Sequence, residues 1–388
     1  MANAIYSGLP TTIFTVMSGL AAEHGAINLG QGFPETEGPE AIRRRAAEAV
    51  LTGSNQYPPM QGLPQLREAV AAHYRRWQGL DLDWRGEVTV TSGGTEALAC
   101  AFLALIEPGD EVVLFQPLYD SYLPMVRRAG GVPRLVRLEP PHWRFDRAAL
   151  EAAFSPRTRL AVLNNPLNPT GSVLAEEDLA LLAEFCVGTG AVAVCDEVWE
   201  QVIFDGAAHR PLMGFPGMRE RTVKIGSAGK MFALTGWKVG FLVAAPPLTA
   251  VLAKAHQFLT FTTPPNLQAA VAYGLASSDD WFAAMPRDLA ASRDRLANAL
   301  RAEGFAPLIS AATYFLDVDL AASGVAEDDM SFCLRAVKEA GVAAIPVSAF
   351  YEENPVTSII RLCFSKRDET LDEGARRLAR ARDLSRRA

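Results

Sequence analysis

The stretch Ile225-Gly-Ser-Ala-Gly-Lys-Met-Phe-Ala-Leu-Thr-Gly-Trp-Lys-Val-Gly240 contains Lys230, the most informative residue of the chain. A lysine amine can hold an aldehyde cofactor as a Schiff base. Ser227 lies three residues before Lys230, and Lys238 lies eight residues after it. A hydroxyl and a second cation could therefore flank one phosphate while Lys230 stays free for imine chemistry.

Two other interpretations of this stretch are weaker. A nucleotide-binding P-loop needs a glycine five residues before the second glycine and a Ser or Thr after the lysine. Here Gly226 lies only three residues before Gly229, and Met231 follows Lys230. A solvated surface lysine is the ordinary case for any single lysine, but the neighbours Met231 and Phe232 are apolar. We therefore expect Lys230 on a turn between core elements.

Length and composition are those of an ordinary globular chain. With 388 residues, two or three domains are expected, or one large α/β domain with a smaller companion. Apolar residues make up 49% of the sequence and charged residues 21%. The net charge of −7 argues against an electrostatic surface for nucleic acids or anionic membranes.

Cysteine and histidine usage predicts a cytoplasmic protein without a metal site. The five cysteines are scattered and lack C-x-x-C spacing, which is typical of reduced thiols, and the five histidines form no metal-binding motif. The N-terminus shows no signal-peptide pattern. The most apolar stretch, residues 239–253, is too short to span a bilayer and contains Pro246-Pro247.

Short apolar segments alternate with helix-length segments between residues 87 and 245. This pattern predicts a mostly parallel, doubly wound sheet, with the ligand site at the carboxyl ends of its strands. After about residue 275 we expect a charged helix over 288–303, short strands, and an amphipathic helix over 371–384. The predicted strands of the sheet are 88–91, 111–115, 159–163, 191–194, 222–225 and 240–244.

Three loops that follow predicted strands carry further motifs. Ser92-Gly-Gly-Thr-Glu-Ala97 points backbone N–H groups and a hydroxyl at an anion, although a plain glycine turn at a helix start is an equally good interpretation of it alone. The second motif is Asn164-Asn-Pro-Leu-Asn-Pro-Thr-Gly171. In the third, Cys195-Asp-Glu-Val-Trp199, an acid directly ends an apolar strand. Such an acid needs a partner, and a protonated pyridine nitrogen is a suitable one.

Together these motifs resemble the class I/II aminotransferases, which use pyridoxal 5'-phosphate (PLP). The resemblance covers nearly the whole chain. It implies the α/β fold-type-I architecture of PLP transferases, with a large domain around the mostly parallel sheet and a smaller α+β domain built from both termini. The expected parts are an N-terminal arm and substrate-closing loop at 1–40, the large PLP-binding domain at 41–280, and the small C-terminal domain at 281–388.

The resemblance also implies roles around the cofactor. Lys230 would carry PLP as a Schiff base and shuttle a proton, while Asp196 would keep the pyridine nitrogen protonated. Asn168 would bind the phenolic oxygen and the substrate carboxylate, and Tyr119 would stack on the ring. Trp199 departs from the family, which usually has tyrosine there in D-E-x-Y. The phosphate would be bound by Gly93, Gly94, Thr95, Ser227 and Lys238, the last of which is arginine in most relatives.

A third set of positions implies a substrate site at a dimer interface. Gly32, in Asn28-Leu-Gly-Gln-Gly-Phe-Pro34, would lie in the loop that closes over the substrate. Arg361 would clamp the α-carboxylate, although a structural salt bridge is the alternative. Tyr57 is similar to the tyrosine that reaches the neighbouring subunit's phosphate, so a homodimer is expected. The candidates for the side-chain pocket are Ile13 and Phe14, with Phe261 and Thr262 from the partner subunit.

The expected activity is a ping-pong transfer of an amino group between an L-amino acid and a 2-oxo acid. The motifs most resemble the group of kynurenine aminotransferases, glutamine transaminase K and methionine aminotransferases, so the expected donors are aromatic, methionine, glutamine or kynurenine-like. One alternative is a PLP-dependent cysteine-S-conjugate β-lyase. A second is an aspartate-type or N-succinyldiaminopimelate-type aminotransferase. A transcription factor with a degenerate aminotransferase domain would need a helix-turn-helix module, which we do not expect in the roughly thirty residues before Gly30.

Overall fold

The computed structural model describes residues 3–385, and the largest sheet in that range has seven strands in the order β2-β8-β7-β6-β5-β3-β4. All neighbouring strands are parallel except β8, which runs antiparallel to both β2 and β7. The predicted mostly parallel sheet is therefore confirmed. Its strands are β2 (Val88–Ser92), β3 (Glu111–Gln116), β4 (Val132–Arg137), β5 (Thr158–Asn164), β6 (Val192–Asp196), β7 (Thr222–Ser227) and β8 (Val239–Ala244).

Helices cover both faces of this sheet, which is why its strands are apolar at successive positions. In β3, Val112 packs in the core that includes residues of α6, whereas its neighbour Val113 packs in the core that includes residues of α9. The helices of this part are α3 (Glu40–Thr52), α4 (Pro64–Gln78), α5 (Trp84–Glu87), α6 (Gly93–Leu105), α7 (Tyr122–Arg128), α8 (Arg147–Ala153), α9 (Glu176–Thr189), α10 (Ala228–Met231), α11 (Pro246–Leu259) and α12 (Pro265–Ser277).

The edge strand β4 is the part of the sheet that the sequence pattern did not predict. It lies at the edge of the sheet opposite β2, and its residues are mostly exposed or half-buried, with Pro133 at its second position. An edge strand needs no continuous apolar run, and proline is tolerated there.

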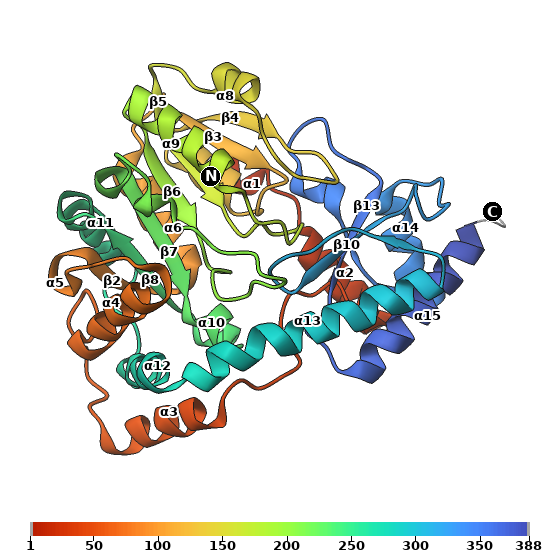
Figure 1. The fold of residues 1–388 in the computed structure, drawn as a ribbon, viewed down its shortest axis with the longest axis horizontal. Helices are drawn as coiled ribbons and strands as arrows, with labels where there is room; N and C mark the ends of the chain where they lie inside the picture. The colour runs from red at the N-terminus through yellow and green to blue at the C-terminus, as the bar shows by residue number, and fades with distance from the viewer. Residues whose placement is uncertain (1–2, 386–388) are drawn as a thin grey trace.

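A smaller α+β part is built from both ends of the chain. β1 (Ile27–Asn28) pairs in parallel with β11 (Val342–Ala343), and α2 (Ile13–Glu23) lies among the C-terminal elements (Figure 1). The fold class is thus the expected one, while the boundaries at residues 40 and 280 stay a prediction. The remaining elements are α1 (Ala4–Ser7), α13 (Asp279–Ala302), β9 (Ala306–Pro307), β10 (Phe315–Asp319), α14 (Asp329–Arg335), β12 (Ile345–Pro346), β13 (Ile359–Cys363) and α15 (Asp368–Ser385).

The helix α13 connects the two parts of the molecule (Figure 1). It begins nine residues before the predicted start, at Asp279, and Pro286 lies inside it. Apolar Phe282 and Met285 are buried on this first section. The sequence interpretation began the helix only after the proline. Of the helices within residues 3–385, none is both long enough and apolar enough to cross a membrane.

Candidate active site

A cavity of about 370 Å³ lies where the carboxyl ends of the large sheet face the smaller part. Asn164, Asp196 and Ser227 are the last residues of β5, β6 and β7, and all three line it. Parallel strands present their carboxyl ends at one edge, so residues far apart in sequence meet there. The cavity brings together these predicted site residues: Phe14, Gly32, Gly93, Gly94, Thr95, Tyr119, Asn168, Asp196, Trp199, Ser227, Lys230, Lys238 and Arg361.

Four other predicted residues do not line the cavity. Tyr57 has 82% of its surface exposed and packs edge-on against Phe261, with 5.4 Å between the ring centroids. The Thr262 hydroxyl donates to the carbonyl of Pro59 at 3.3 Å, so these residues share one surface region. Ile13 packs against the core of the smaller part. That Tyr57, Phe261 and Thr262 contribute to the active site of a partner subunit stays a prediction.

Lys230 is half-buried in the short helix α10, and its Nζ lies between an aromatic ring and a hydroxyl. It donates to the Tyr314 hydroxyl at 3.0 Å and lies 4.6 Å from the ring centroid of Trp199. Burial lowers the pKa of Lys230 to about 8, because the charged form loses its hydration. A substantial fraction of the amine is therefore unprotonated slightly above neutral pH, as a nucleophile requires.

Asp196 has one satisfied and one unsatisfied carboxylate oxygen. Its Oδ2 accepts from the Tyr122 hydroxyl at 2.6 Å. Its Oδ1 is buried and has no hydrogen-bond partner among residues 3–385. Burial raises the pKa of this carboxyl group. Such an orphaned acceptor in a cavity wall calls for a donor from a bound molecule, and a protonated ring nitrogen would supply one.

The N-terminus of α6 forms the anion-binding end of the cavity. Gly93 and Gly94 begin the helix, and the Nζ of Lys238 lies 3.4 Å from the Thr95 hydroxyl. Gly93 has φ +71°, and a Cβ at this position would lie 3.1 Å from the Lys238 Nζ. Glycine therefore suits both the backbone and the space here. Backbone N–H groups, a hydroxyl and an ammonium together fit a phosphate group.

Arg361 projects from β13 and is almost fully buried. Its Nη1 donates to the Asn168 side-chain oxygen at 2.9 Å, and its Nη2 donates to the Gly30 carbonyl at 2.7 Å. Its Nε is buried without a partner in the described part of the chain. The guanidinium carbon lies 3.9 Å from the ring centroid of Phe315, and burial lowers the pKa of Arg361 to about 10. No carboxylate among residues 3–385 forms an ion pair with Arg361, so its positive charge is available for the carboxylate of a substrate.

Gly32 lies beside this guanidinium, in the loop that precedes α3. A Cβ on Gly32 would lie 2.8 Å from Phe315 Cζ. The close approach of this backbone to the aromatic ring therefore requires glycine.

Several contributing residues were missed by the sequence interpretation. Asn164 is the last residue of its strand, as Asp196 is, and this position in the sequence could have identified it as a site residue. Tyr122 lies three residues after Tyr119, a spacing that could have placed it near the same site. Phe315 begins β10 and Tyr314 directly precedes it, in a segment without a recognisable motif, so only the fold reveals them. Gln31, Leu98, Val198, Gly229 and Thr235 complete the lining.

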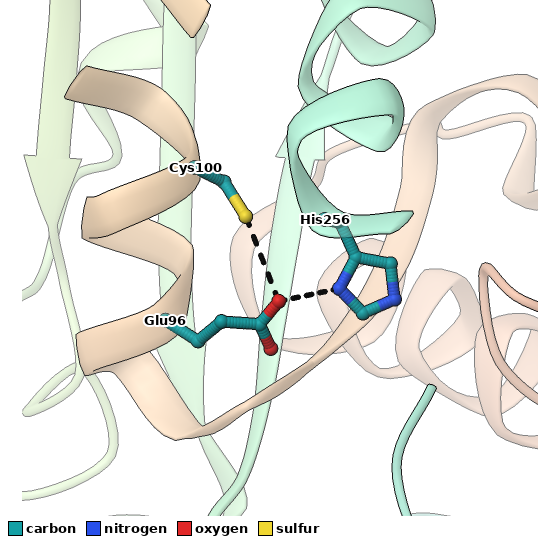
Figure 2. Close-up of side chains that lie close together, drawn as sticks. All are labelled: Glu96, Cys100 and His256. Atoms are coloured by element: carbon teal, nitrogen blue, oxygen red, sulfur yellow. Dashed lines mark hydrogen bonds and ion pairs between the residues drawn. The ribbon is translucent and has the colours of Figure 1, made fainter. Parts of the chain in front are cut away.

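A buried ion pair anchors α6 from behind (Figure 2). His256 Nδ1 lies 2.5 Å from the carboxylate of Glu96, and its Nε2 lies 2.8 Å from the carbonyl of Met60. A carbonyl can only accept, so Nε2 carries a proton. Glu96 also accepts from Thr260 at 2.8 Å and from Cys100 at 3.6 Å. The cluster thereby ties the phosphate-binding helix to the loop that carries Tyr57.

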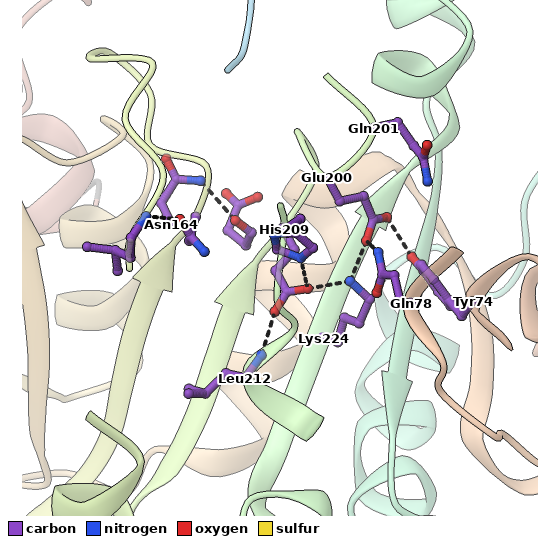
Figure 3. Close-up of polar contacts among 12 residues, drawn as sticks. Tyr74, Gln78, Asn164, Glu200, Gln201, His209, Leu212 and Lys224 are labelled. Carbon is purple, nitrogen blue, oxygen red and sulfur yellow. Dashed lines mark hydrogen bonds and ion pairs between the residues drawn. The ribbon is translucent and has the colours of Figure 1, made fainter. Parts of the chain in front are cut away.

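A second buried network lies beside Asp196 (Figure 3). The ammonium of Lys224 contacts the carboxylates of both Glu197 and Glu200. Glu200 also accepts from the Tyr74 hydroxyl at 2.9 Å, and Glu197 lies 2.8 Å from His209 Nε2. The two carboxylates and His209 have the donor types of metal ligands, but the Lys224 ammonium lies where it would repel a cation.

The cavity therefore fits PLP at three points: an acid with an unpaired oxygen for the ring nitrogen, a cationic helix terminus for the phosphate, and the Lys230 amine with its lowered pKa for the aldehyde. Residues 24–378 match the family described as aminotransferase class I and II. The chain belongs to the class I and II aminotransferases. Its cofactor is accordingly PLP.

Relatives of this aminotransferase share both its sequence and its shape. A probable N-succinyldiaminopimelate aminotransferase of Mycobacterium tuberculosis is 46% identical over 95% of this chain and 96% of its own. The methionine aminotransferase of Escherichia coli is 43% identical, with 95% and 96% covered. The solved structure of the N-succinyldiaminopimelate aminotransferase from M. tuberculosis superimposes with a TM-score of 0.95 at 45% identity, covering 98% of this chain and all of the other.

Proposed function

We propose that this aminotransferase moves an amino group between an L-amino acid with an aromatic, methionine-like, glutamine-like or kynurenine-like side chain and a 2-oxo acid by a ping-pong mechanism. The observation that carries the proposal is the convergence of Lys230, Asp196 and Arg361 on one cavity. These residues supply an amine, an acid for the cofactor ring and a carboxylate clamp.

The residues around the cavity have complementary tasks in this proposal. Bound PLP supplies a carbonyl carbon that exchanges amino groups and a ring that withdraws electrons from the substrate α-carbon. Asp196 Oδ1 accepts a hydrogen bond from the ring nitrogen, and Tyr119 covers the ring. Thr95, Ser227 and Lys238, with the N-terminus of α6, hold the phosphate.

Lys230 and Arg361 act on the substrate. Since the pKa of Lys230 is about 8, its Nζ can both take and return a proton near neutral pH. Arg361 orients the substrate by binding its α-carboxylate with N–H groups that its bonds to Asn168 and Gly30 leave unused. Asn168 accepts from Arg361 through its Oδ1, which leaves its Nδ2 group to donate to the cofactor's phenolic oxygen.

The cavity walls favour apolar or aromatic donors. The ring centroids of Phe14 and Phe315 lie 5.2 and 3.9 Å from the guanidinium carbon of Arg361, and Phe315 also packs edge-on against Trp199, with 5.5 Å between the centroids. Among the described lining residues the cations are Lys230, Lys238 and Arg361, and each already has a task. The cavity lining within residues 3–385 thus offers no further cation for a second substrate carboxylate, which disfavours an aspartate-type activity. The similarity to the M. tuberculosis relative supports N-succinyldiaminopimelate as a second candidate substrate.

We also infer a homodimer in the cytoplasm. Tyr57, Phe258 and Leu51 are large apolar side chains with at least 82% of their surface exposed, which is typical of an uncovered interface. The five cysteines, all within the described range, are free thiols, as expected in a reducing compartment. Sedimentation at assay concentration should give a dimer, and a fully active monomer would contradict the assembly.

A half-transamination screen tests the activity. The PLP enzyme is mixed with each of twenty amino acids, and separately with N-succinyl-diaminopimelate, while the cofactor's absorbance is followed. Rapid conversion to the amino form by aromatic donors and methionine is expected. Release of pyruvate and ammonia from a cysteine S-conjugate would instead indicate the β-lyase, and an unchanged spectrum with all donors would contradict both enzymes.

A further inference from the structure

Tyr314 lies directly behind Lys230 and connects it to the loop that closes the cavity. Its hydroxyl accepts from Lys230 Nζ at 3.0 Å and donates to the carbonyl of Gly32 at 2.7 Å. Tyr314 is buried, and its ring packs edge-on against Trp199 with 4.4 Å between the centroids. The side chain is therefore fixed on two sides and has little freedom to move.

The direction of these two hydrogen bonds follows from chemistry. The Gly32 carbonyl can only accept, so the single proton of the Tyr314 hydroxyl points at it. The lone pairs of that oxygen are then left to accept from the Lys230 amine. Burial raises the pKa of Tyr314 well above its usual range, so the hydroxyl stays protonated and does not act as a base.

Two side chains, Arg361 and Tyr314, donate hydrogen bonds to carbonyl groups of the loop around Gly32. Arg361 binds the Gly30 carbonyl, and Tyr314 binds the Gly32 carbonyl. Arg361 is the proposed reader of the substrate carboxylate, while Tyr314 contacts the proposed reactive amine. The two contacts place both chemical ends of an amino-acid substrate in touch with the same short loop.

We propose that Tyr314 is a positioning residue that fixes the Lys230 amine through the relay from Lys230 Nζ to the Tyr314 hydroxyl to the Gly32 carbonyl. The inference rests on the proposed role of Lys230. It assigns to Tyr314 two effects: it orients the amine toward the cavity, and it anchors the closing loop. Because the acceptor stabilises the ammonium form, its removal should favour the neutral amine.

The test is Tyr314→Phe, which keeps the ring and removes the hydroxyl. The pKa of Lys230 is measured in the cofactor-free dimer by competitive acetylation at a series of pH values, with the Lys230 peptide quantified by mass spectrometry. We expect a fall of roughly 1 unit from the wild-type value, the size expected for losing one hydrogen bond to a charged group. The other groups that act on Lys230, namely Cys363, Asp196, Arg361 and Lys238, are unchanged by the substitution.

Hydrogen exchange at the amides of residues 30–33 gives the second readout, and it should become faster in Tyr314→Phe. Tyr351→Phe is the matched control, since the Tyr351 hydroxyl donates to the Leu138 carbonyl at 2.7 Å and Tyr351 does not line the cavity. It should change neither readout. Tyr314→His keeps a ring acceptor and serves as a second variant if the phenylalanine variant does not fold. It should retain a Lys230 pKa closer to wild type.

An unchanged or raised Lys230 pKa in the folded Tyr314→Phe variant, or unchanged exchange of the loop, would overturn the proposal. Failure of the proposed function is recognised separately. If PLP does not protect Lys230 of the wild-type enzyme from acetylation, the lysine is not the attachment site, whatever Tyr314→Phe shows.

Discussion

Lys224 is buried and Lys230 is half-buried; they lie six residues apart, and their pKa values shift in opposite directions. Burial would lower the pKa of Lys224, but the carboxylates of Glu197 and Glu200 outweigh it, and the pKa is raised. Lys230 has no carboxylate within hydrogen-bonding distance among residues 3–385, so burial prevails and its pKa falls to about 8. The partner supplied to a buried charge, more than burial itself, decides whether a lysine is structural or reactive.

The same contrast separates the two carboxylates at the end of β6. Glu197 is fully engaged by Lys224, His209 and the backbone of Leu212. Its neighbour Asp196 keeps one oxygen without a partner within the described residues. Adjacent residues of a strand end point to opposite sides, so one acid supports the fold and the other faces the cavity. The unsatisfied atoms therefore mark the functional side.

The largest effect is expected from Lys230→Met. It should lower kcat by at least about 10⁴-fold, the upper range for loss of a general acid–base group, because the attachment point is lost as well. PLP should still bind through the phosphate contacts, which equilibrium dialysis can show. A Lys230→Met enzyme that transaminates at the wild-type rate would remove the central assignment.

Lys224→Met should have its main effect on stability. It leaves Glu197 and Glu200 as two buried carboxylates without their cation, which should cost about 3 to 5 kcal/mol in the free energy of unfolding. Lys230→Met is the matched control, and its unfolding free energy in the cofactor-free state should change far less. Urea unfolding of both variants checks this. Equal losses of stability would show that the comparison of the two lysines is wrong.

Arg361→Lys keeps the charge at the carboxylate clamp but loses the planar fork. We expect kcat/KM to fall by roughly 10- to 1000-fold for every amino-acid and oxo-acid substrate, which corresponds to about 1.4 to 4 kcal/mol of charge-assisted hydrogen bonding. Steady-state kinetics with several donors measures it. Unchanged constants throughout would place the clamp elsewhere.

The elements that could be predicted from the sequence are those determined by a short segment of the chain. The six predicted strands are short, mostly apolar or β-branched segments, and Lys230, Asp196 and Asn168 lie in loop motifs. β4 lacks such a segment because it is an edge strand. Tyr314 could not be assigned, because its contact with Lys230 spans 84 residues and depends on how the smaller part packs on the large sheet. Orphaned atoms and pKa shifts likewise arise only in the packed structure.

A third buried ion pair, between Glu96 and His256, provides a smaller and pH-dependent effect. Burial opposes the charge on His256, but the hydrogen bond and charge of Glu96 prevail, and the pKa of His256 is raised above its usual value near 6.5. The pair's contribution to stability is therefore fully present below about pH 6.5 and is lost as pH rises through the higher folded pKa. The groups facing the ring are Glu96, Thr260 and the Met60 carbonyl.

Replacing His256 with Gln should remove this pH dependence. Wild type should exceed His256→Gln by about 1 to 2 kcal/mol at pH 6, and the difference should shrink at pH 9. Urea unfolding at both pH values measures it, with Glu96→Gln as the control that removes the cause of the raised pKa. A difference that grows with pH would reverse the assigned sign.

The smallest expected effect concerns Trp199, which packs against the reactive lysine and offers no hydroxyl. Its indole lies 4.6 Å from Lys230 Nζ and edge-on to Tyr314, and its N–H makes no hydrogen bond to any residue that the structure describes. We infer that Trp199 fills space and that Asn168 alone holds the cofactor's phenolic oxygen. Trp199→Tyr would add a hydroxyl that stabilises the phenolate.

That variant should lower the pH midpoint of the bound cofactor's absorbance change by roughly 0.5 to 1 unit, since one neutral hydrogen bond is worth about 1 kcal/mol. Trp199→Phe is the matched control, because it removes the indole N–H without adding a hydroxyl, and its midpoint should equal that of wild type. If the indole N–H already donates a hydrogen bond to the phenolic oxygen, both midpoints differ from these expectations. The phenylalanine variant would then titrate at higher pH, and the tyrosine variant would titrate with wild type or above it, because one donor would merely have replaced another.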